Sequence, residues 1–281
     1  MIGAVLTLIL CVGFVAPALA EPFEDGLEAY AKGDYETTLE YWRPLAERGL
    51  ADAQSSLGWM YAEGEGVPED DAEAAKWYRR AAEQGLARAQ YNLGVMSTTG
   101  AGIPKDEAEA VKWFRMAALQ GYAPAQSNLG SMYDTGAGVP ENDAEAMKWY
   151  RKAAEQGYGE AVKWFRDAAL QGDAVAQHTL GVMYAEGKGP AQSHAEAVKW
   201  FRKAAQQGYA TAQTDLGAMY ASGAGVTQDW IQAYAWFDVA AASRNQDAVR
   251  MRNLVTRELT DEQFAEALKL AREYSEKYRA K

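Results

Sequence analysis

Two short strings recur along the chain at an interval of 36 residues, and this period is the strongest constraint on the fold. The string Ala-Gln-x-x-Leu-Gly occurs five times, with its final glycine at Gly58, Gly94, Gly130, Gly181 and Gly217. The string Lys-Trp-(Tyr/Phe)-Arg also occurs five times, at Trp77, Trp113, Trp149, Trp164 and Trp200. A fixed interval of this length indicates a solenoid, in which each repeat is one supersecondary unit packed on its neighbours.

The first half of each unit has the pattern of a helix with one buried face. In the first unit, the spacing predicts a helix over 51–63 whose buried face is Ala53, Leu57, Met60 and Tyr61. A glycine inside a helix costs about 0.5–1 kcal/mol relative to alanine, so the repeated glycine indicates close approach by a neighbouring helix. The repeated glutamine, Gln54 in this unit, is expected to hydrogen-bond the backbone at the turn between units.

The second half of each unit is predicted to be another helix, which starts near Asp71 in the first unit. A loop of the form Gly-x-Gly-Val-Pro separates the two helices, because glycine supplies positive φ and proline stops the first helix. Trp77 and its copies are expected to be buried core residues. Gly85 stands where a helix C-cap is expected, so the fold class is all-α.

Together, these strings resemble the Sel-1-like repeat (SLR) family, which is related to tetratricopeptide repeats. The resemblance covers five near-complete copies over about residues 50–243; each has the glycine-containing loop, and all but the last have the ending Arg-x-Ala-Ala-x-Gln-Gly. It implies a right-handed α-solenoid of helical pairs that acts as a protein-binding adaptor or scaffold. It also implies that partners bind the surface lined by the first helix of each pair.

The flanking segments are expected to extend the same array. Tyr41 takes the register of the tryptophans, and Thr260 and Gln263 form a capping box for a terminal helix. The expected organisation is a signal peptide at 1–20, an N-terminal helical pair at 21–49, a first repeat block at 50–156, a truncated repeat at 157–172, a second block at 173–243 and capping helices at 244–281.

One unit is shorter than the others by a whole helix. The interval from Trp149 to Trp164 is 15 residues, so a first helix and its loop are missing. Because consecutive helices joined by short turns run antiparallel, the helix at 160–171 is expected in a first-helix position. The next helix, near 174–186, is then expected in a second-helix position. This irregularity predicts a seam near 157–172, which acts either as a functional hinge or as a harmless kink.

Residues 1–20 have the pattern of a cleaved secretory signal peptide. An apolar run from Ile2 to Ala16 carries no charged side chain, and Ala18-Leu19-Ala20 then precedes a polar segment. A run of about 15 apolar residues is short for a membrane span, so we expect cleavage and no stable membrane insertion. The mature protein is expected to be periplasmic or secreted. It has no cysteine, because the single one, Cys11, lies in the leader.

The charge of the chain argues against one class of partner and favours another. Its formal charge is −11, from 28 Lys+Arg and 39 Asp+Glu, and nucleic-acid binding depends on basic side chains. Residues 21–156 hold 13 Lys+Arg and 24 Asp+Glu, whereas 157–281 hold 15 of each. The acidic block either keeps the protein in solution or faces a cationic protein partner.

Candidate binding residues are those that vary on the first helices while their neighbours repeat, because shared packing does not dictate them. Aromatic side chains dominate interface hot spots, and amides or carboxylates can hydrogen-bond a peptide backbone. The last loop adds one tryptophan outside the repeated register. The candidate surface is Trp59, Tyr91, Asn92, Asn128, His178, Asp215 and Trp230.

Catalytic and cofactor motifs are absent from the sequence. It has no His-Glu-x-x-His, Gly-x-Ser-x-Gly or Gly-x-x-x-x-Gly-Lys-Ser/Thr, and two histidines alone do not make a metal site. We therefore expect no enzyme, no cofactor and no metal, but an exported protein–protein interaction scaffold. The alternative is an envelope protein that binds cell-wall glycan or its processing enzymes. A hydrolase that uses acidic residues is a more distant possibility.

Overall fold

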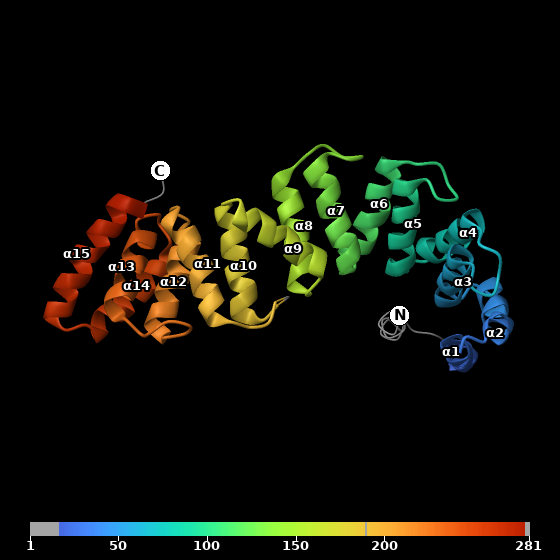
Figure 1. Ribbon diagram of the computed structural model, residues 1–281, viewed down its shortest axis with the longest axis horizontal. Coiled ribbons are helices and arrows are strands. Elements are labelled where there is room, and N and C mark those ends of the chain that lie inside the picture. The colour runs from blue at the N-terminus through green and yellow to red at the C-terminus, as the bar shows by residue number, and fades with distance from the viewer. Residues whose placement is uncertain (1–16, 189, 279–281) are drawn as a thin grey trace. The chain divides into compact units, whose positions relative to one another are not determined.

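The computed structural model describes residues 17–188 and 190–278, and every regular element in these ranges is a helix, as the sequence predicts. The chain divides into two compact units, of which the first ends at Trp149 and the second begins at Tyr150. Figure 1 labels the helices along the chain. They are α1 (Pro17–Ala31), α2 (Tyr35–Glu47), α3 (Ala51–Glu63), α4 (Asp71–Glu83), α5 (Ala87–Thr99), α6 (Glu107–Leu119), α7 (Ala123–Thr135), α8 (Asp143–Glu155), α9 (Gly159–Leu170), α10 (Ala174–Glu186), α11 (His194–Gln206), α12 (Ala210–Ser222), α13 (Trp230–Ala241), α14 (Gln246–Val255) and α15 (Asp261–Tyr278).

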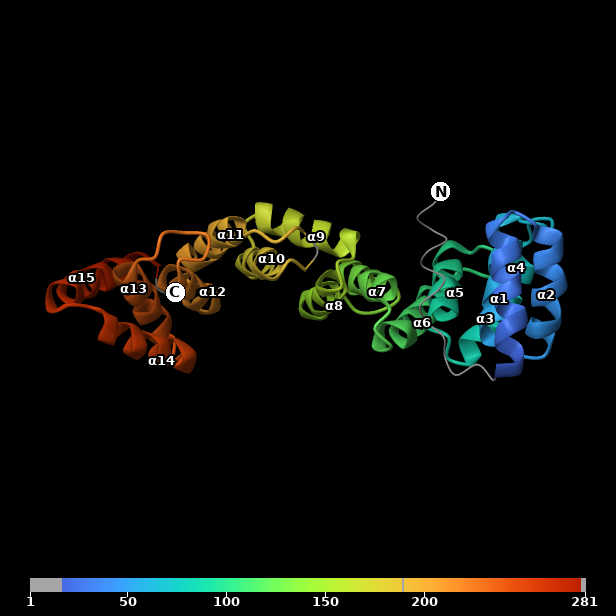
Figure 2. The same ribbon diagram turned by 90° about the horizontal axis from the view of Figure 1, so that it is seen from below.

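The helices of the first unit follow one another as packed neighbours. Figures 1 and 2 show the N-terminal pair of α1 and α2, then α3 with α4 and α5 with α6. The predicted helix over 51–63 is confirmed, and it ends where Gly64 adopts a φ of 68° and donates its N–H to the Met60 carbonyl. Asp70 caps the next helix by accepting a hydrogen bond from the Glu73 N–H at 2.9 Å. Local capping therefore sets the ends of each pair.

At four of the five repeated positions, the glycine inside the first helix is seen to lie against an aromatic ring of the second helix, which confirms the predicted close approach there. A Cβ added at Gly58 would lie 2.8 Å from Tyr78 Cδ1, and one at Gly94 would lie 2.7 Å from Phe114 Cε1. Ordinary van der Waals contact between carbons needs about 3.5–4.0 Å, so no larger residue fits without displacing the ring. The same contact recurs between Gly181 and Phe201 and between Gly217 and Phe237.

In most repeats, the residue after the repeated tryptophan lies deeper in the core than the tryptophan itself, whereas Trp149 and Tyr150 are equally buried. Phe114 is 1% exposed, whereas Trp113 is only half-buried. The expectation of fully buried tryptophans is thus wrong for Trp113, and also for Trp164 and Trp200, although Trp77, Trp149 and Trp236 are buried. The same offset appears in the N-terminal pair, where Tyr41 is exposed and Trp42 is buried.

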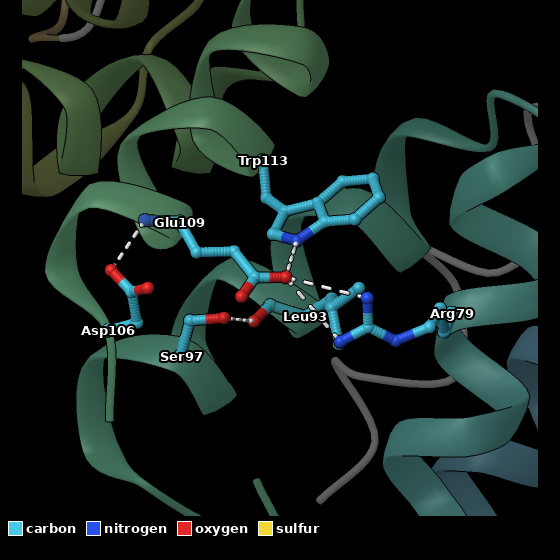
Figure 3. A network of polar contacts seen from close by, with 6 residues as sticks. All are labelled: Arg79, Leu93, Ser97, Asp106, Glu109 and Trp113. Carbon is cyan, nitrogen blue, oxygen red and sulfur yellow. Dashed lines mark hydrogen bonds and ion pairs between the residues drawn. The ribbon is translucent and has the colours of Figure 1, made fainter. Parts of the chain in front are cut away.

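The polar edge of the indole explains this offset, as Figure 3 shows for Trp113. The Trp113 Nε1–H donates to Glu109 Oε1 at 3.1 Å, and the same oxygen accepts from Arg79 on the preceding second helix at 3.4 Å. Glu109 thus satisfies the indole N–H of Trp113 at the border between repeats, whereas the Nε1 of the more buried Trp77 has no hydrogen-bond partner among the described residues. The plain phenyl ring of Phe114 has no N–H and can fill the space over Gly94.

Each repeated glutamine is buried and closes the turn that leads into its helix. Gln54 Nε2 donates to the Ala46 carbonyl at 3.0 Å, and Gln54 Oε1 accepts from Gln84 Nε2 at 2.7 Å. The bond to the carbonyl eight residues earlier recurs at Gln90, Gln126, Gln177 and Gln213. The predicted structural role of the glutamines is confirmed, because each side-chain amide adds a second kind of donor to a carbonyl that also accepts the N–H of the glycine three residues later.

The truncated unit consists of α9 alone, and it disturbs its successors less than expected. Gln177 on α10 donates to the Ala169 carbonyl at 3.0 Å, as in complete units, and α10 packs on α11 as a first helix. The prediction that α10 takes a second-helix position is therefore wrong, because the turn at 171–173 is the one that precedes every other first helix. The border between the two compact units lies within α8, just ahead of the predicted seam at 157–172.

The C-terminal helix α15 covers the end of the second unit by packing on α13. The capping box is confirmed, because the Thr260 N–H donates to Gln263 Oε1 at 3.0 Å and the Gln263 N–H donates to Thr260 Oγ1 at 3.2 Å. The Tyr274 hydroxyl donates to Gln232 Oε1 of α13 at 2.9 Å. The helix α15 thereby covers the apolar side chains of α13.

Candidate protein-binding surface

The structure distributes the seven candidate residues over both units and places them in different environments. The first unit holds Trp59 on α3, Tyr91 and Asn92 on α5 and Asn128 on α7. The second unit holds His178 on α10, Asp215 on α12 and Trp230 on α13. Most are half-buried, and Trp59 alone is strongly exposed. The candidates therefore do not form one site.

Trp59 is the candidate that the structure leaves open to solvent. The residue is 43% exposed on α3, and its Nε1–H donates to the Tyr30 hydroxyl at 3.1 Å. This hydrogen bond holds the indole in one orientation. An oriented aromatic side chain is a suitable interface anchor, because a partner that covers it immobilises little additional freedom.

Trp59 belongs to a cluster with Tyr30, Tyr35 and Glu65, which we call the Trp59 cluster. The Tyr30 hydroxyl donates to Glu65 Oε2 at 2.5 Å, and the Tyr35 hydroxyl lies 3.3 Å from Glu65 Oε1. The two tyrosine rings are 5.6 Å apart between centroids. Burial and the hydrogen bond to Glu65 raise the pKa of Tyr30, so its phenol stays neutral at ordinary pH. The cluster thus joins an exposed indole to a carboxylate held by two phenols.

Sequence reasoning missed three members of this cluster, although a signal existed for Glu65. Its position is the middle of the Gly-x-Gly loop, where the other units have Ala101, Ala137, Lys188 and Ala224. A glutamate at this position departs from the shared pattern in the same way as Trp59 does on its helix. Tyr30 and Tyr35 lie in the N-terminal pair, outside the repeated strings, so periodicity offers no comparison for them.

Tyr91 and Asn92 take part in packing inside the first unit. The Tyr91 ring lies 5.8 Å from Phe114 and 5.3 Å from Tyr122, between centroids. Asn92 hydrogen-bonds the Tyr78 hydroxyl, and burial raises the pKa of Tyr78. Both candidates vary in sequence because they meet different neighbours within the fold, and they offer a partner less surface than Trp59.

His178 and Asp215 contact each other, which the sequence did not predict. His178 Nε2 lies 2.7 Å from Asp215 Oδ2, and the imidazole packs against the rings of Phe201 and Tyr209. The pair joins α10 to α12, the first helices of successive repeats. Within the described ranges, no group of three or more possible metal ligands includes them. The contact between His178 and Asp215 therefore links two successive repeats.

Trp230 does not lie in the last loop, so that expectation is wrong. It is the first residue of α13, directly after the capping residue Asp229, and it packs half-buried beside the core residues Ala233 and Tyr234. Its neighbour along the chain, Ile231, packs on the same cluster. Trp230 therefore belongs mainly to the packing of the C-terminal cap.

Negative charge is concentrated around the Trp59 cluster. Residues 21–70 hold 3 Lys+Arg and 13 Asp+Glu, whereas residues 71–281 hold 25 Lys+Arg and 26 Asp+Glu. One of the three cations, Lys32, is already paired with Glu28 at 2.6 Å. The segment of α1 to α3 thus carries nearly the whole net charge of the protein, and its potential attracts cations. Separately, none of the helices in the described part of the chain combines the length and apolarity needed to cross a bilayer.

Comparison with known proteins identifies the repeats. A protein-family model, the Sel1 repeat, matches residues 51–86, 87–122, 123–158, 158–173, 174–209 and 210–245. Its fourth match coincides with the truncated unit. A curated relative, an exopolysaccharide production negative regulator from Rhizobium leguminosarum bv. viciae, is 43% identical over 54 residues. That match covers 19% of this chain and only 20% of the relative.

Two solved structures are similar in sequence over most of the chain. A Sel1 repeat protein from Oxalobacter formigenes is 32% identical, with 89% of this chain and 99% of that chain covered and a TM-score of 0.47. A protective antigen of uropathogenic Escherichia coli strains, which displays an SLR fold, is 33% identical, with 92% and 69% covered and a TM-score of 0.44.

Proposed function

Since this chain belongs to the Sel1 repeat family, we propose that it is an exported scaffold that binds a cationic protein partner through its first unit. The family fold is that of protein-interaction scaffolds, which are generally non-catalytic. The observation that carries the proposal is the exposed Trp59 within the acidic segment 21–70. An aromatic anchor supplies affinity, and the surrounding charge steers and selects an oppositely charged partner.

A pull-down experiment tests for the partner. The predicted mature chain, residues 21–281, is immobilised and then exposed to an envelope extract of the native host. We expect a basic protein that elutes as salt rises from 0.1 M to 1 M, because the screening length then falls from about 10 Å to about 3 Å. A Trp59→Ala variant is expected to retain less of it. If neither the salt concentration nor the Trp59→Ala substitution changes the amount of partner that is captured, the proposed surface is contradicted.

Export is a separate part of the proposal and has its own test. It rests on the leader pattern at 1–20, of which residues 1–16 lie outside the described ranges and α1 begins at Pro17. Cell fractionation followed by mass spectrometry of the intact protein is expected to find an envelope or secreted form that begins at Glu21. A cytoplasmic protein that retains Met1 contradicts export.

One observation favours the alternative, an envelope protein that binds cell-wall glycan or its processing enzymes. The relative matched over 54 residues is named for negative regulation of exopolysaccharide production. Sedimentation of the mature chain with purified peptidoglycan, together with the absence of any reproducible protein partner, supports this alternative. Failure to sediment supports the scaffold.

A further inference from the structure

We propose that the Trp59 cluster is a receptor for an arginine side chain of the protein partner, a role that rests on the proposed function. The cluster offers two chemical features that a guanidinium recognises together. One is an indole that is 43% exposed, and the other is a carboxylate within the same group of side chains. Guanidinium groups stack on aromatic rings and hydrogen-bond carboxylates through several N–H donors.

The indole of Trp59 is prepared for such stacking. Its polar edge is engaged, because Nε1 donates to Tyr30 at 3.1 Å, and the residue is still 43% exposed. Elsewhere the protein stacks its own cations on tryptophans: Arg80 lies 4.5 Å from the Trp77 ring centroid. In the described ranges, no lysine or arginine is placed over Trp59 in this way. A cation from outside the chain can therefore take this position.

The carboxylate of Glu65 is held by two hydrogen bonds and can still accept more. Its two oxygens face the Tyr30 hydroxyl at 2.5 Å and the Tyr35 hydroxyl at 3.3 Å. A carboxylate offers about four lone-pair sites, so two acceptor sites are left for incoming N–H groups. Because the phenols fix the carboxylate in advance, an arriving guanidinium does not have to order it.

The charge around the cluster decides which ligand fits. Residues 21–70 carry 13 acidic and 3 basic side chains, a potential that repels anions and attracts cations. A single carboxylate supplies too few ligands to hold a divalent metal, which takes six or more oxygens. Between the two cationic side chains, arginine matches better, because the weakly hydrated planar guanidinium stacks on indole more readily than an ammonium.

The first experiment uses three peptides that differ only in one type of side chain: Ac-(Gly-Arg)3-Gly-NH2, its lysine counterpart and its citrulline counterpart. They are titrated into the ¹⁵N-labelled mature chain, and the Trp59 indole N–H resonance is assigned from its loss in Trp59→Leu. We expect the arginine peptide to shift this resonance with dose, the lysine peptide to bind more weakly and the neutral citrulline peptide to leave it unmoved. Equal shifts with arginine and citrulline refute the receptor.

Matched variants separate the cluster from general attraction to an acidic surface. Glu65→Gln and Trp59→Leu are each expected to weaken the arginine peptide about two- to fivefold. The control is Glu40→Gln, which removes the same charge from an exposed position of the same acidic segment and is expected to leave affinity nearly unchanged. Equal loss in Glu65→Gln and Glu40→Gln shows non-specific attraction and overturns the proposal. Thermal melts check that each variant is folded.

The native partner distinguishes failure of this receptor from failure of the scaffold function. If a partner is captured and both Trp59→Leu and Glu65→Gln retain it fully, the scaffold stands and the arginine receptor falls. If peptide binding depends on both residues but no partner is captured, the receptor stands and the scaffold function falls.

Discussion

Substitution of Gly94 by alanine tests whether close helix contact, rather than chance, keeps glycine inside the first helices. Alanine in a helix interior is more favourable than glycine by about 0.8–1.0 kcal/mol. At Gly94, however, the new Cβ would lie 2.7 Å from Cε1 and 2.8 Å from Cδ1 of Phe114, which is 1% exposed. Overpacking of a filled core costs about 1–3 kcal/mol. We therefore expect Gly94→Ala to lower the free energy of unfolding by about 0–2 kcal/mol, the overpacking cost less the gain in helix propensity.

The chain offers a matched control in Gly159, the first residue of α9, where an added Cβ meets nothing within 4 Å. Gly159→Ala is expected to be neutral or to stabilise by up to about 1 kcal/mol. Urea unfolding followed by circular dichroism measures both variants. In a Phe114→Leu background, which removes the ring atoms in question, the penalty of Gly94→Ala is expected to shrink by more than 1 kcal/mol, or about fivefold in the folding equilibrium. If Gly94→Ala stabilises the protein as much as Gly159→Ala, the close-contact reasoning is refuted.

Three further experiments test other interactions. Gln90→Ala is expected to cost about 1–3 kcal/mol in urea unfolding, because it removes two hydrogen bonds, the 3.1 Å bond to the Ala82 carbonyl and the 2.8 Å bond from Gln120 Nε2; a cost near zero contradicts this role. Burial raises the pKa of Asp52, so the folded state disfavours its charge; Asp52→Asn should raise the melting temperature near pH 7, and this gain should vanish as acid protonates the carboxyl in both states. A gain that persists in acid contradicts the assignment. A double-mutant cycle of His178→Ala and Asp215→Ala should give a coupling of about 0.5–1 kcal/mol, and zero coupling argues against the 2.7 Å contact.

Most of the features that the sequence predicts correctly are governed by local rules; the exception is the close approach of a second helix to the repeated glycine, which the repetition itself indicates. The helix over 51–63 ends at a glycine because a left-handed residue terminates it there, and such a residue can be recognised from the loop alone. The capping box of Thr260 and Gln263 depends on residues three positions apart. Gln54 and its copies bond a carbonyl eight residues earlier, across a turn that is itself repeated. Each of these interactions closes within one repeat or one turn.

The burial of the tryptophans could not be predicted in this way. Trp113 and Phe114 recur together, so periodicity cannot tell which of two adjacent residues faces the core. The choice depends on a contact between two helices, Phe114 against Gly94, and on the partner that the Trp113 N–H finds in Glu109. The position of α10 could not be predicted from antiparallel alternation along the chain either, because its packing follows the turn that immediately precedes it.

The Trp59 cluster shows that residues which depart from the repeated pattern can be brought together by the fold. In sequence, Trp59 is a variable position on a helix and Glu65 a variable position in a loop, and nothing indicates that they belong together. The structure joins them through Tyr30, which accepts from one and donates to the other. Tyr30 belongs to the N-terminal pair, where no repeat constrains its identity. The repeated residues hold consecutive helices together, whereas Trp59, Glu65 and Tyr30 do not belong to that pattern and meet where the acidic N-terminal pair packs on the first repeat. This is why we place the proposed recognition site there.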